Sequence, residues 1–222
     1  MTKKKCSYCG TELTKRNSDK EHVFPACLYP DSKKYFNVQR LTIPSCKKCN
    51  NGWSDDEAHF RNVLMVSGEP PNSPRQEIWD GAVLRSFDQP DGLKRMNDLL
   101  QLMRPVNINE QEQQMVFPAE DPRILRVVRK IVRGLCYHHR ILFPILDEQV
   151  WADVLRFQPP AGYLDRMQYH HRKPEIAEYW YEIFDEEKVH SVWIITFYKS
   201  IRFIGRVSKT AWGLPDKEGQ DS

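Results

Sequence analysis

Four of the six cysteines form two Cys-x-x-Cys pairs near the start of the chain. The pairs are Cys6 with Cys9 and Cys46 with Cys49. Each pair offers two thiolates at short spacing, and four thiolates complete the tetrahedral shell of a structural zinc ion. In a reducing compartment disulfides are rare, so two such pairs indicate a metal site. We therefore predict a structural zinc ion here and expect Cys27 and Cys136 to be small apolar side chains.

A carboxylate and a histidine stand between the two pairs, in Glu21-His22-Val23-Phe24-Pro25, and Asn50 directly follows the last cysteine. The oxygen ligands of Glu21 and Asn50 suit Mg²⁺ or Mn²⁺ better than zinc. A histidine with an ordinary pKa of about 6.5 is mostly neutral at cellular pH and can activate water. Alternation along a strand would turn Glu21 and His22 to different sides. This set fits metal-assisted phosphodiester cleavage, with His22 deprotonating water.

The order C-x-x-C, E-H-V-F-P, C-x-x-C-N-N-G-W-S-D-D-E resembles the HNH endonuclease family, in its subgroup with a four-cysteine structural zinc. The resemblance covers about residues 3–66. It implies a treble-clef-like ββα-metal fold that cuts DNA, sometimes RNA, with one divalent cation. By this resemblance His22 aligns with the general base, Glu21 with the acidic metal ligand and Asn50 with the ligand on the final helix.

The chain departs from the family pattern at two positions. The family's central asparagine, which orients the histidine through the backbone, would stand where this chain has Arg40-Leu41, and Asn37 is the nearest substitute. Many relatives also have a histidine or lysine one turn beyond the helical ligand. This chain has Ser54 there, so we expect Glu57 or water to complete the shell of the catalytic cation.

Two asparagines and several cations around this motif have alternative roles. Asn50 could also cap a helix, and Asn51 ranks behind it because Asn51-Gly52 also suits a turn. Residues 1–66 contain twelve Lys and Arg against seven Asp and Glu, which leaves the segment near +5. This charge would attract a polyanion, and a solvated surface explains it equally well. The candidate substrate contacts are Lys47, Lys48 and Arg40.

The hydrophobic pattern predicts the elements that position these residues. One strand or two short ones are expected within 35–43, and three antiparallel strands are expected within 179–207. Helices are expected from the second cysteine pair to about residue 66, over 121–140 and around 146–156. Asp121 would be the N-cap of the 121–140 helix, with Pro122 in its first turn. Trp53 is expected in the core rather than as a platform for a base.

The helix over 121–140 has an apolar and a basic side. The basic side chains are Arg123, Arg126, Arg129, Lys130 and Arg133. This side would either follow a phosphate backbone or face solvent, and we favour solvent. The histidine pairs 138–139 and 170–171 are interpreted as loop residues. The basic and aromatic residues within 198–206 fit either nucleic-acid contact or a half-buried sheet, and we favour the sheet.

The 222 residues suit one large domain or two small ones. We predict an α+β fold with an HNH module at residues 1–67, a Gly/Pro/Ser-rich linker at 68–75, a separate α+β region of unknown role at 76–215 and a flexible tail at 216–222. No stretch approaches the roughly 20 apolar residues of a membrane span, and no apolar core follows the basic start, so we expect the cytoplasm rather than secretion or a membrane.

These observations predict a metal-dependent HNH endonuclease that hydrolyses phosphodiester bonds, with structural Zn and catalytic Mg or Mn. The expected partner is nucleic acid, DNA rather than RNA, and the family type suggests a defence or mobile-element effector. A non-catalytic zinc-dependent DNA-binding module and a ribonuclease effector are the alternatives. The sequence sets neither the oligomeric state nor the role of residues 76–215.

Overall fold

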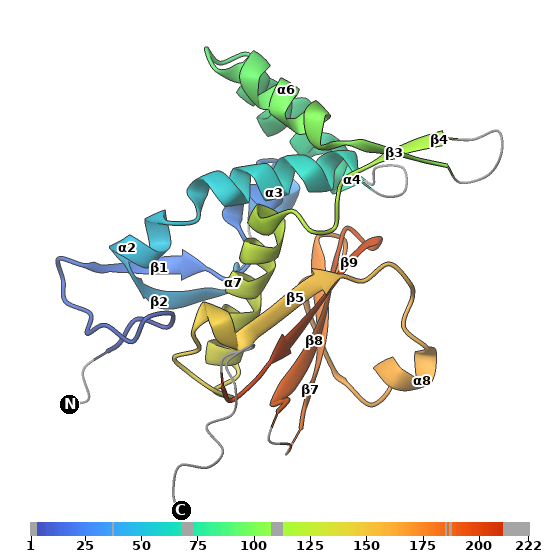
Figure 1. Cartoon of the computed structure of the whole chain (residues 1–222). Helices are drawn as coiled ribbons and strands as arrows, with labels where there is room; N and C mark the ends of the chain where they lie inside the picture. Colours follow the sequence, from blue (N-terminus) through green and yellow to red (C-terminus); the bar gives the residue numbers. More distant parts are fainter. Residues whose placement is uncertain are drawn as a thin grey trace, which may run out of the picture.

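The computed structural model describes residues 4–36, 38–67, 73–107, 113–184, 186 and 188–210, and shows a mixed α+β fold (Figure 1). The helices are η1 (Ala26–Leu28), α1 (Lys33–Phe36), α2 (Lys47–Asn51), α3 (Ser54–Val66), α4 (Ser73–Ile78), η2 (Trp79–Val83), α5 (Leu84–Phe87), α6 (Gly92–Leu102), α7 (Pro122–His138), η3 (Asp147–Gln149) and α8 (Ala161–Leu164). The strands are β1 (Ser18–His22), β2 (Thr42–Cys46), β3 (Arg104–Asn107), β4 (Gln113–Val116), β5 (Val150–Val154), β6 (Gln168–Lys173), β7 (Ala177–Ile183), β8 (Ser191–Phe197) and β9 (Ile201–Val207).

The N-terminal part contains an antiparallel pair of strands, β1 and β2, with η1 and α1 in the connection between them and α2 and α3 after β2. Glu21 pairs with Ile43 and His22 with Thr42, and α2 begins directly after Cys46. The strand expected within 35–43 is wrong for most of its length, because residues 33–36 form α1 and pairing with β1 starts only at Thr42. Tyr35 is nevertheless fully buried, so its apolar surface is used by a helical turn instead of a strand.

The helix expected from the second cysteine pair to residue 66 is divided into α2 and α3. The break falls at Gly52 and Trp53, and glycine is a weak helix former. Trp53 is buried, with its ring 6.0 Å from that of Tyr8 and the Arg126 guanidinium 4.6 Å from its centre. The prediction that Trp53 belongs to the core is confirmed.

Helix α6 and the strands β3 and β4 project from the rest of the molecule in Figure 1. Residues 68–72 of the expected linker lie outside the described residues, and Ser73 already begins α4. Helices α4, η2, α5 and α6 follow one another, and then the strands β3 and β4 pair antiparallel. The exposed side chains of Leu93 and Leu100 show that one apolar side of α6 is not covered by other described residues.

Helix α7 lies at the centre of the fold and confirms the helix expected over 121–140 (Figure 1). The Asp121 carboxylate caps it by accepting a hydrogen bond of 2.9 Å from the backbone N–H of Arg123, and Pro122 is the first helical residue. Its apolar side is buried, with Val127, Val128 and Ile131 fully excluded from solvent. The helix therefore packs between the N-terminal part and the C-terminal sheet.

The C-terminal part is a five-stranded antiparallel sheet in the order β5-β9-β8-β7-β6. The three strands expected within 179–207 are confirmed as β7, β8 and β9. The helix expected around 146–156 is wrong: after η3, the chain enters β5, where Val150 pairs with Val207. The edge of β9 offers backbone hydrogen bonds to this segment, and this tertiary pairing overrides its helical pattern.

One hydrophobic core joins the two ends of the chain. Phe24 and Phe60 of the N-terminal part contact the ring of Phe197 in β8, with centroids 6.1 and 5.5 Å apart. Gly134 of α7 lies against Val23 and Ile43. The described residues within 1–67 and within 76–215 thus share one core, and the predicted domain boundaries remain a prediction. The expected tail at 216–222 lies outside the described residues.

Among the described helices, none combines the length and apolar character that crossing a membrane requires.

Candidate metal centre and the buried lysine beside it

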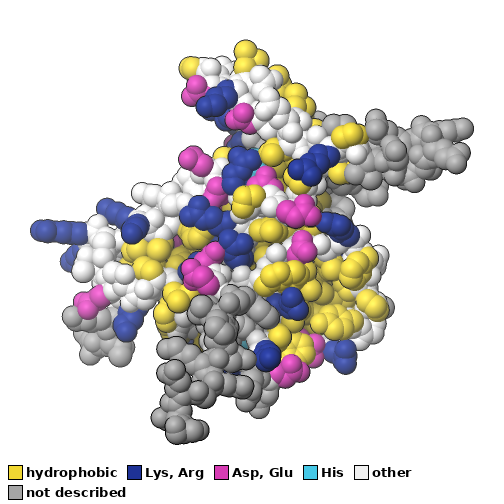
Figure 2. All heavy atoms as spheres, viewed as in Figure 1, with side chains coloured by type: hydrophobic (Ala, Val, Ile, Leu, Met, Phe, Trp, Pro, Cys, Tyr) yellow, Lys and Arg dark blue, Asp and Glu magenta, His cyan; other side chains and the backbone are white. Residues whose placement is uncertain are grey.

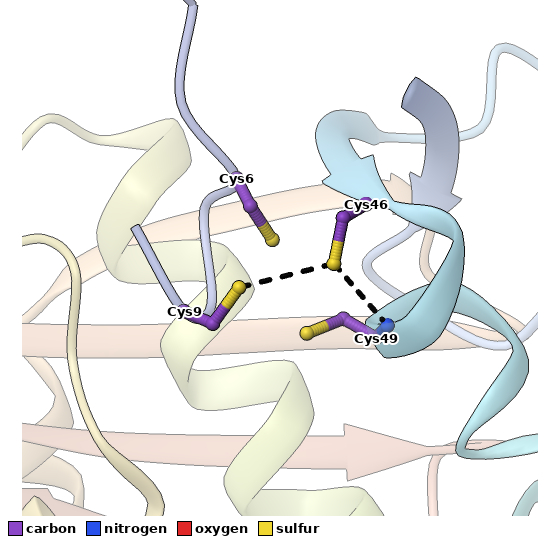
Figure 3. Close-up of side chains that lie close together, drawn as sticks. All are labelled: Cys6, Cys9, Cys46 and Cys49. Carbon is purple, nitrogen blue, oxygen red and sulfur yellow. Dashed lines mark hydrogen bonds between the residues drawn. The ribbon is translucent and has the colours of Figure 1, made fainter. Parts of the chain in front are cut away.

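The four paired cysteines converge at one end of the β1–β2 pair (Figure 3). Their sulfur atoms all lie within 4.8 Å of one another. Cys9 Sγ and Cys46 Sγ are 3.8 Å apart, and four sulfurs at about 2.3 Å from a tetrahedral zinc ion would be spaced by about 3.8 Å. The cluster can therefore hold a metal ion such as zinc, and the donor set fits a closed structural site.

The ionisation of these thiols also suits a metal. Burial raises the pKa of the Cys9 thiol, but hydrogen bonds from the side chain and backbone of Thr11 outweigh it and lower the pKa to about 6. Burial raises the pKa of Cys46 and that of Cys49. Cys9 is thus a thiolate at neutral pH, and a bound dication would favour the thiolate form of the other cysteines as well.

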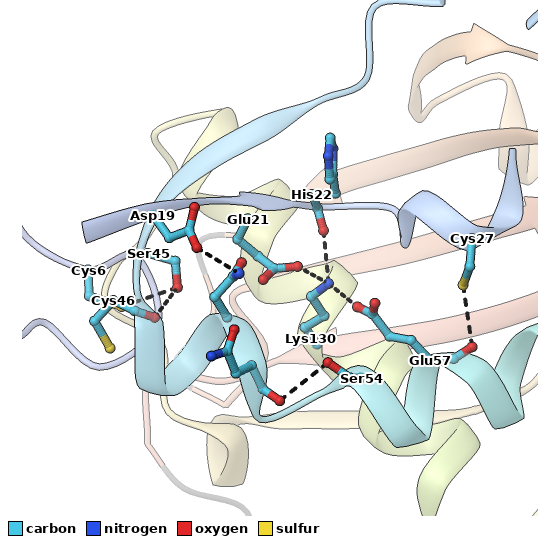
Figure 4. A network of polar contacts seen from close by, with 12 residues as sticks. Cys6, Asp19, Glu21, His22, Cys27, Ser45, Cys46, Ser54, Glu57 and Lys130 are labelled. Atoms are coloured by element: carbon cyan, nitrogen blue, oxygen red, sulfur yellow. Dashed lines mark hydrogen bonds and ion pairs between the residues drawn. The ribbon is translucent and has the colours of Figure 1, made fainter. Parts of the chain in front are cut away.

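Glu21 lies on the side of β1 that faces α3 and α7, where it meets a buried lysine (Figure 4). Its Oε1 is 2.5 Å from Lys130 Nζ, and the same amine is 2.5 Å from Glu57 Oε1. The Lys130 side chain is fully buried. Burial raises the pKa of the Glu21 carboxyl above its ordinary value, and Lys130 opposes that rise. The sequence assigned Lys130 to a surface and did not connect it with Glu21.

His22 points to the opposite side of β1 from Glu21 and Lys130, as the strand alternation predicts (Figure 4). Its side chain is half-buried. Burial lowers the pKa of the His22 imidazole, and the positive charges of Arg40 and Lys130 lower it further. The imidazole is therefore neutral at pH 7, which is the form that can accept a proton. Its Nδ1 is buried and has no hydrogen-bond partner among the described residues.

Asn50 lies beside β1 but contacts Asp19 rather than Glu21. Its Nδ2 donates a hydrogen bond of 3.2 Å to Asp19 Oδ2 at the protein surface. Asn50 is the fourth residue of α2, whose N-cap is Cys46, so its interpretation as a helix cap is wrong. Sequence reasoning missed Asp19, although the two-residue period of a strand puts it on the same side of β1 as Glu21.

The remaining candidate residues surround these groups at different depths. Glu57 pairs with Lys130, and its backbone carbonyl lies 3.6 Å from Cys27 Sγ. Lys47 and Lys48 are exposed in α2, and the Asn51 carbonyl accepts a hydrogen bond from Ser54. The Arg40 guanidinium is 5.0 Å from the centre of the Tyr29 ring. Asn37 lies outside the described residues.

Two cations of α7, Lys130 and Arg133, are buried and contact the N-terminal part of the chain, which corrects both interpretations made from the sequence for these two residues. Arg133 is buried and donates hydrogen bonds of 2.9 Å to the Tyr8 carbonyl and 2.7 Å to the Ile145 carbonyl. Arg126 pairs with Asp56 at 2.6 Å. Arg126 remains largely exposed, whereas Arg133 can be buried because acceptors from distant segments surround it. Lys130 and Arg133 therefore neither face solvent nor are available to a phosphate backbone.

Three of the four paired histidines lie in regular elements rather than loops: His138 ends α7, and His170 and His171 are in β6. His139 follows the last residue of α7, with its Nε2 2.9 Å from the Tyr179 hydroxyl, and His170 in β6 stacks on Tyr179 with centroids 5.4 Å apart. In the C-terminal segment Tyr198 and Phe203 are buried, which agrees with the sheet interpretation.

Comparisons of the chain with family models, with curated proteins and with solved structures find no match. The fold class and the four-cysteine cluster stand on the geometry above. The likeness to HNH endonucleases stands on the order of the sequence motifs.

Proposed function

We propose that this protein is a metal-dependent HNH-type endonuclease that hydrolyses phosphodiester bonds in DNA. The observation that carries the proposal is the placement of its chemistry on β1, β2 and α2. These elements hold a four-cysteine cluster suited to zinc, and the same β1 and α2 carry Glu21, His22 and Asn50. An antiparallel strand pair followed by a helix is also the order that the sequence resemblance implies.

In the proposed reaction His22 takes a proton from the attacking water, because its lowered pKa keeps the imidazole neutral at cellular pH. The Asp19 carboxylate and the Asn50 amide meet at the surface of β1 and α2, and Glu21 lies on the same side of the strand at greater depth. Bound Mg²⁺ or Mn²⁺ would offset the negative charge that develops on the scissile phosphate. The cysteine cluster would fix the strands and take no part in the chemistry.

The surface around these elements suits a polyanion. Figure 2 shows Lys and Arg side chains along the end of the molecule where α2, β1 and β2 lie. Lys47 and Lys48 are exposed on α2, immediately beside the cysteine cluster. Contacts of this kind grip the phosphate backbone without reading bases, so they support binding of nucleic acid in general.

A second candidate function is a non-catalytic zinc-dependent module that binds DNA. The pairing of Lys130 with Glu21 and Glu57 favours it, because carboxylates already neutralised by a protein cation attract a divalent ion less strongly. This candidate predicts metal-loaded protein that binds DNA and never cuts it.

A cleavage assay tests the proposal on supercoiled plasmid, linear duplex, single-stranded DNA and RNA, each with Mg²⁺, Mn²⁺ or EDTA. We expect metal-dependent cutting of DNA that falls at least about 100-fold in His22→Ala, as loss of a general base predicts. His171→Ala, which changes an exposed histidine on β6, is the matched control and should cut like the wild type. Equal cutting by His22→Ala would overturn the mechanism. Degradation of RNA alone would identify a ribonuclease, and binding without cutting would identify the non-catalytic module.

A further inference from the structure

Lys130 is a fully buried ammonium group whose hydrogen bonds are all satisfied by the N-terminal part of the chain. A lysine amine has three N–H donors. Lys130 Nζ lies 2.5 Å from Glu21 Oε1, 2.5 Å from Glu57 Oε1 and 2.8 Å from the backbone carbonyl oxygen of His22. Two of the three acceptors belong to consecutive residues of β1, one through its side chain and one through its backbone (Figure 4).

This contact fixes the backbone from which the His22 side chain projects. The peptide group is planar, so holding the His22 carbonyl oxygen also sets the plane of the peptide that joins it to Val23. The N–H of that peptide donates to the Leu41 carbonyl at 2.9 Å. Both polar groups of this peptide, its C=O and its N–H, are therefore hydrogen-bonded. Lys130 on α7 provides the contact to the C=O.

We propose that Lys130 is a positioning residue for the candidate active site: it holds the carbonyl of His22 and the carboxylate of Glu21 together and so sets the direction of the His22 imidazole. The inference rests on the proposed function for its catalytic consequence. Because Lys130 is fully buried, it cannot touch a nucleic-acid substrate and must act through the two residues of β1. The C-terminal part of the chain thus contributes to a site whose motif lies entirely within residues 1–66.

Two variants of α7 separate positioning from simple stability. Lys130→Met keeps a long apolar side chain but cannot donate a hydrogen bond. Arg133→Met is the matched control, because Arg133 is also a buried cation that joins α7 to the N-terminal part, through the Tyr8 carbonyl, and it has no contact with β1 among its hydrogen bonds and ion pairs in the described residues. Both proteins are first checked for zinc content and a cooperative thermal transition.

A single NMR signal reports on the contact itself. The sequence contains one His-Val dipeptide, His22-Val23, so labelling histidine with ¹³C at the carbonyl and valine with ¹⁵N gives one carbonyl–nitrogen correlation. We expect the His22 carbonyl signal to move in Lys130→Met and to stay in place in Arg133→Met. An unmoved signal in folded Lys130→Met would overturn the proposal. If Lys130→Met does not fold, the double variant Lys130→Met/Glu57→Gln is used, because it leaves one carboxylate fewer without a partner. Its His22 carbonyl signal is then compared with that of Glu57→Gln alone.

Cleavage kinetics test the consequence for catalysis. A misdirected general base should lower kcat about 100-fold in Lys130→Met with KM changed by less than about threefold, whereas Arg133→Met should keep the wild-type kcat. Equal kcat in folded Lys130→Met would contradict the positioning role. If the wild-type protein cuts no substrate, the proposed function fails, and the NMR signal still decides whether Lys130 holds the His22 carbonyl.

Discussion

Two polar centres adjoin the β1–β2 pair, one at its end and one on the side that faces α3 and α7, and they are neutralised in different ways. The cysteine cluster gathers four sulfur atoms and contains no cation of the protein among its ligand groups. The other centre joins the carboxylates of Glu21 and Glu57 and already contains a cation, Lys130. The first centre can therefore hold a metal ion. In the second centre the positive charge is the ammonium group of Lys130.

The difference also concerns distance along the chain. The cysteine cluster uses residues 6–49, all within the motif that the sequence displays. The centre at Glu21 is completed by a residue that stands 108 positions beyond His22. A thiolate cluster that lacks its ion should be unstable, whereas the carboxylate centre should depend on the packing of α7.

Loss of the metal site should have the largest effect. Cys46→Ser, or removal of metal by a strong chelator, is expected to unfold the N-terminal part, because structural zinc in small sites contributes about 10–16 kcal/mol of apparent binding energy to folding. Metal analysis should find about one zinc per wild-type chain and much less in the variant, and circular dichroism should show the loss of structure. A metal-free protein that keeps a cooperative transition would contradict a structural zinc site.

Loss of the lysine should have the next largest effect. Lys130→Met leaves the buried Glu21 and the half-buried Glu57 without their cation, and breaking a buried pair in this way costs about 3–5 kcal/mol. Urea unfolding followed by fluorescence measures this loss, and zinc content should stay at the wild-type level. If the free energy of unfolding falls by less than about 1 kcal/mol, Lys130 is not the main group that neutralises the two carboxylates.

Asp121 joins α3 to α7 and should matter less. It caps α7 and lies 2.8 Å from His59 Nε2 in α3. Burial lowers the pKa of His59, so the neutral imidazole donates its N–H to the carboxylate. Asp121→Ala should lower the free energy of unfolding by about 1–2 kcal/mol, as loss of an N-cap does. Urea unfolding at neutral pH checks this value, and Asp121→Asn, which can still cap the helix, should lose less.

The same residue predicts part of the acid sensitivity. Burial alone would raise the pKa of Asp121, but the hydrogen bonds from His59 and from the backbone of Arg123 outweigh it and lower the pKa below its ordinary value of 3.8. The carboxylate therefore stabilises the fold above about pH 4, and this contribution is lost as the pH falls through the lowered pKa. The free energy of unfolding, measured between pH 2 and 5, should depend less steeply on pH in Asp121→Ala than in the wild type.

The smallest effect is expected at Gly134, where α7 touches both strands of the pair. A Cβ there would lie 3.1 Å from each γ-methyl of Val23 and 3.3 Å from Cδ1 of Ile43. Gly134→Ala would gain about 1 kcal/mol of helix propensity and lose about 1–3 kcal/mol to crowding. We expect a net loss near 1 kcal/mol in thermal unfolding, with zinc content unchanged. A net gain would show that the contact between α7 and the strands can relax.

Features that depend on local residue spacing could be predicted from the amino-acid sequence. Two Cys-x-x-Cys pairs predict four sulfur atoms around one point, because two thiols at knuckle spacing can reach a common ion. The amphipathic run after Asp121 predicts α7 and its cap, and the β-branched and aromatic runs predict β7, β8 and β9. Alternation along β1 placed Glu21 and His22 on opposite sides, as they are observed.

The contacts between polar groups of distant segments could not be predicted in this way and follow from the folded chain. The sequence pattern of α7 shows a basic side, and a basic side alone suggests solvent or phosphate. The fold brings Glu21, Glu57 and the carbonyls of His22 and Tyr8 against that side, and these acceptors allow Lys130 and Arg133 to be buried. The segment at 150–154 likewise became a strand because the edge of β9 was available to it. Hydrogen bonds and ion pairs between distant segments leave no periodic mark in a sequence, so they appear only when the chain is folded.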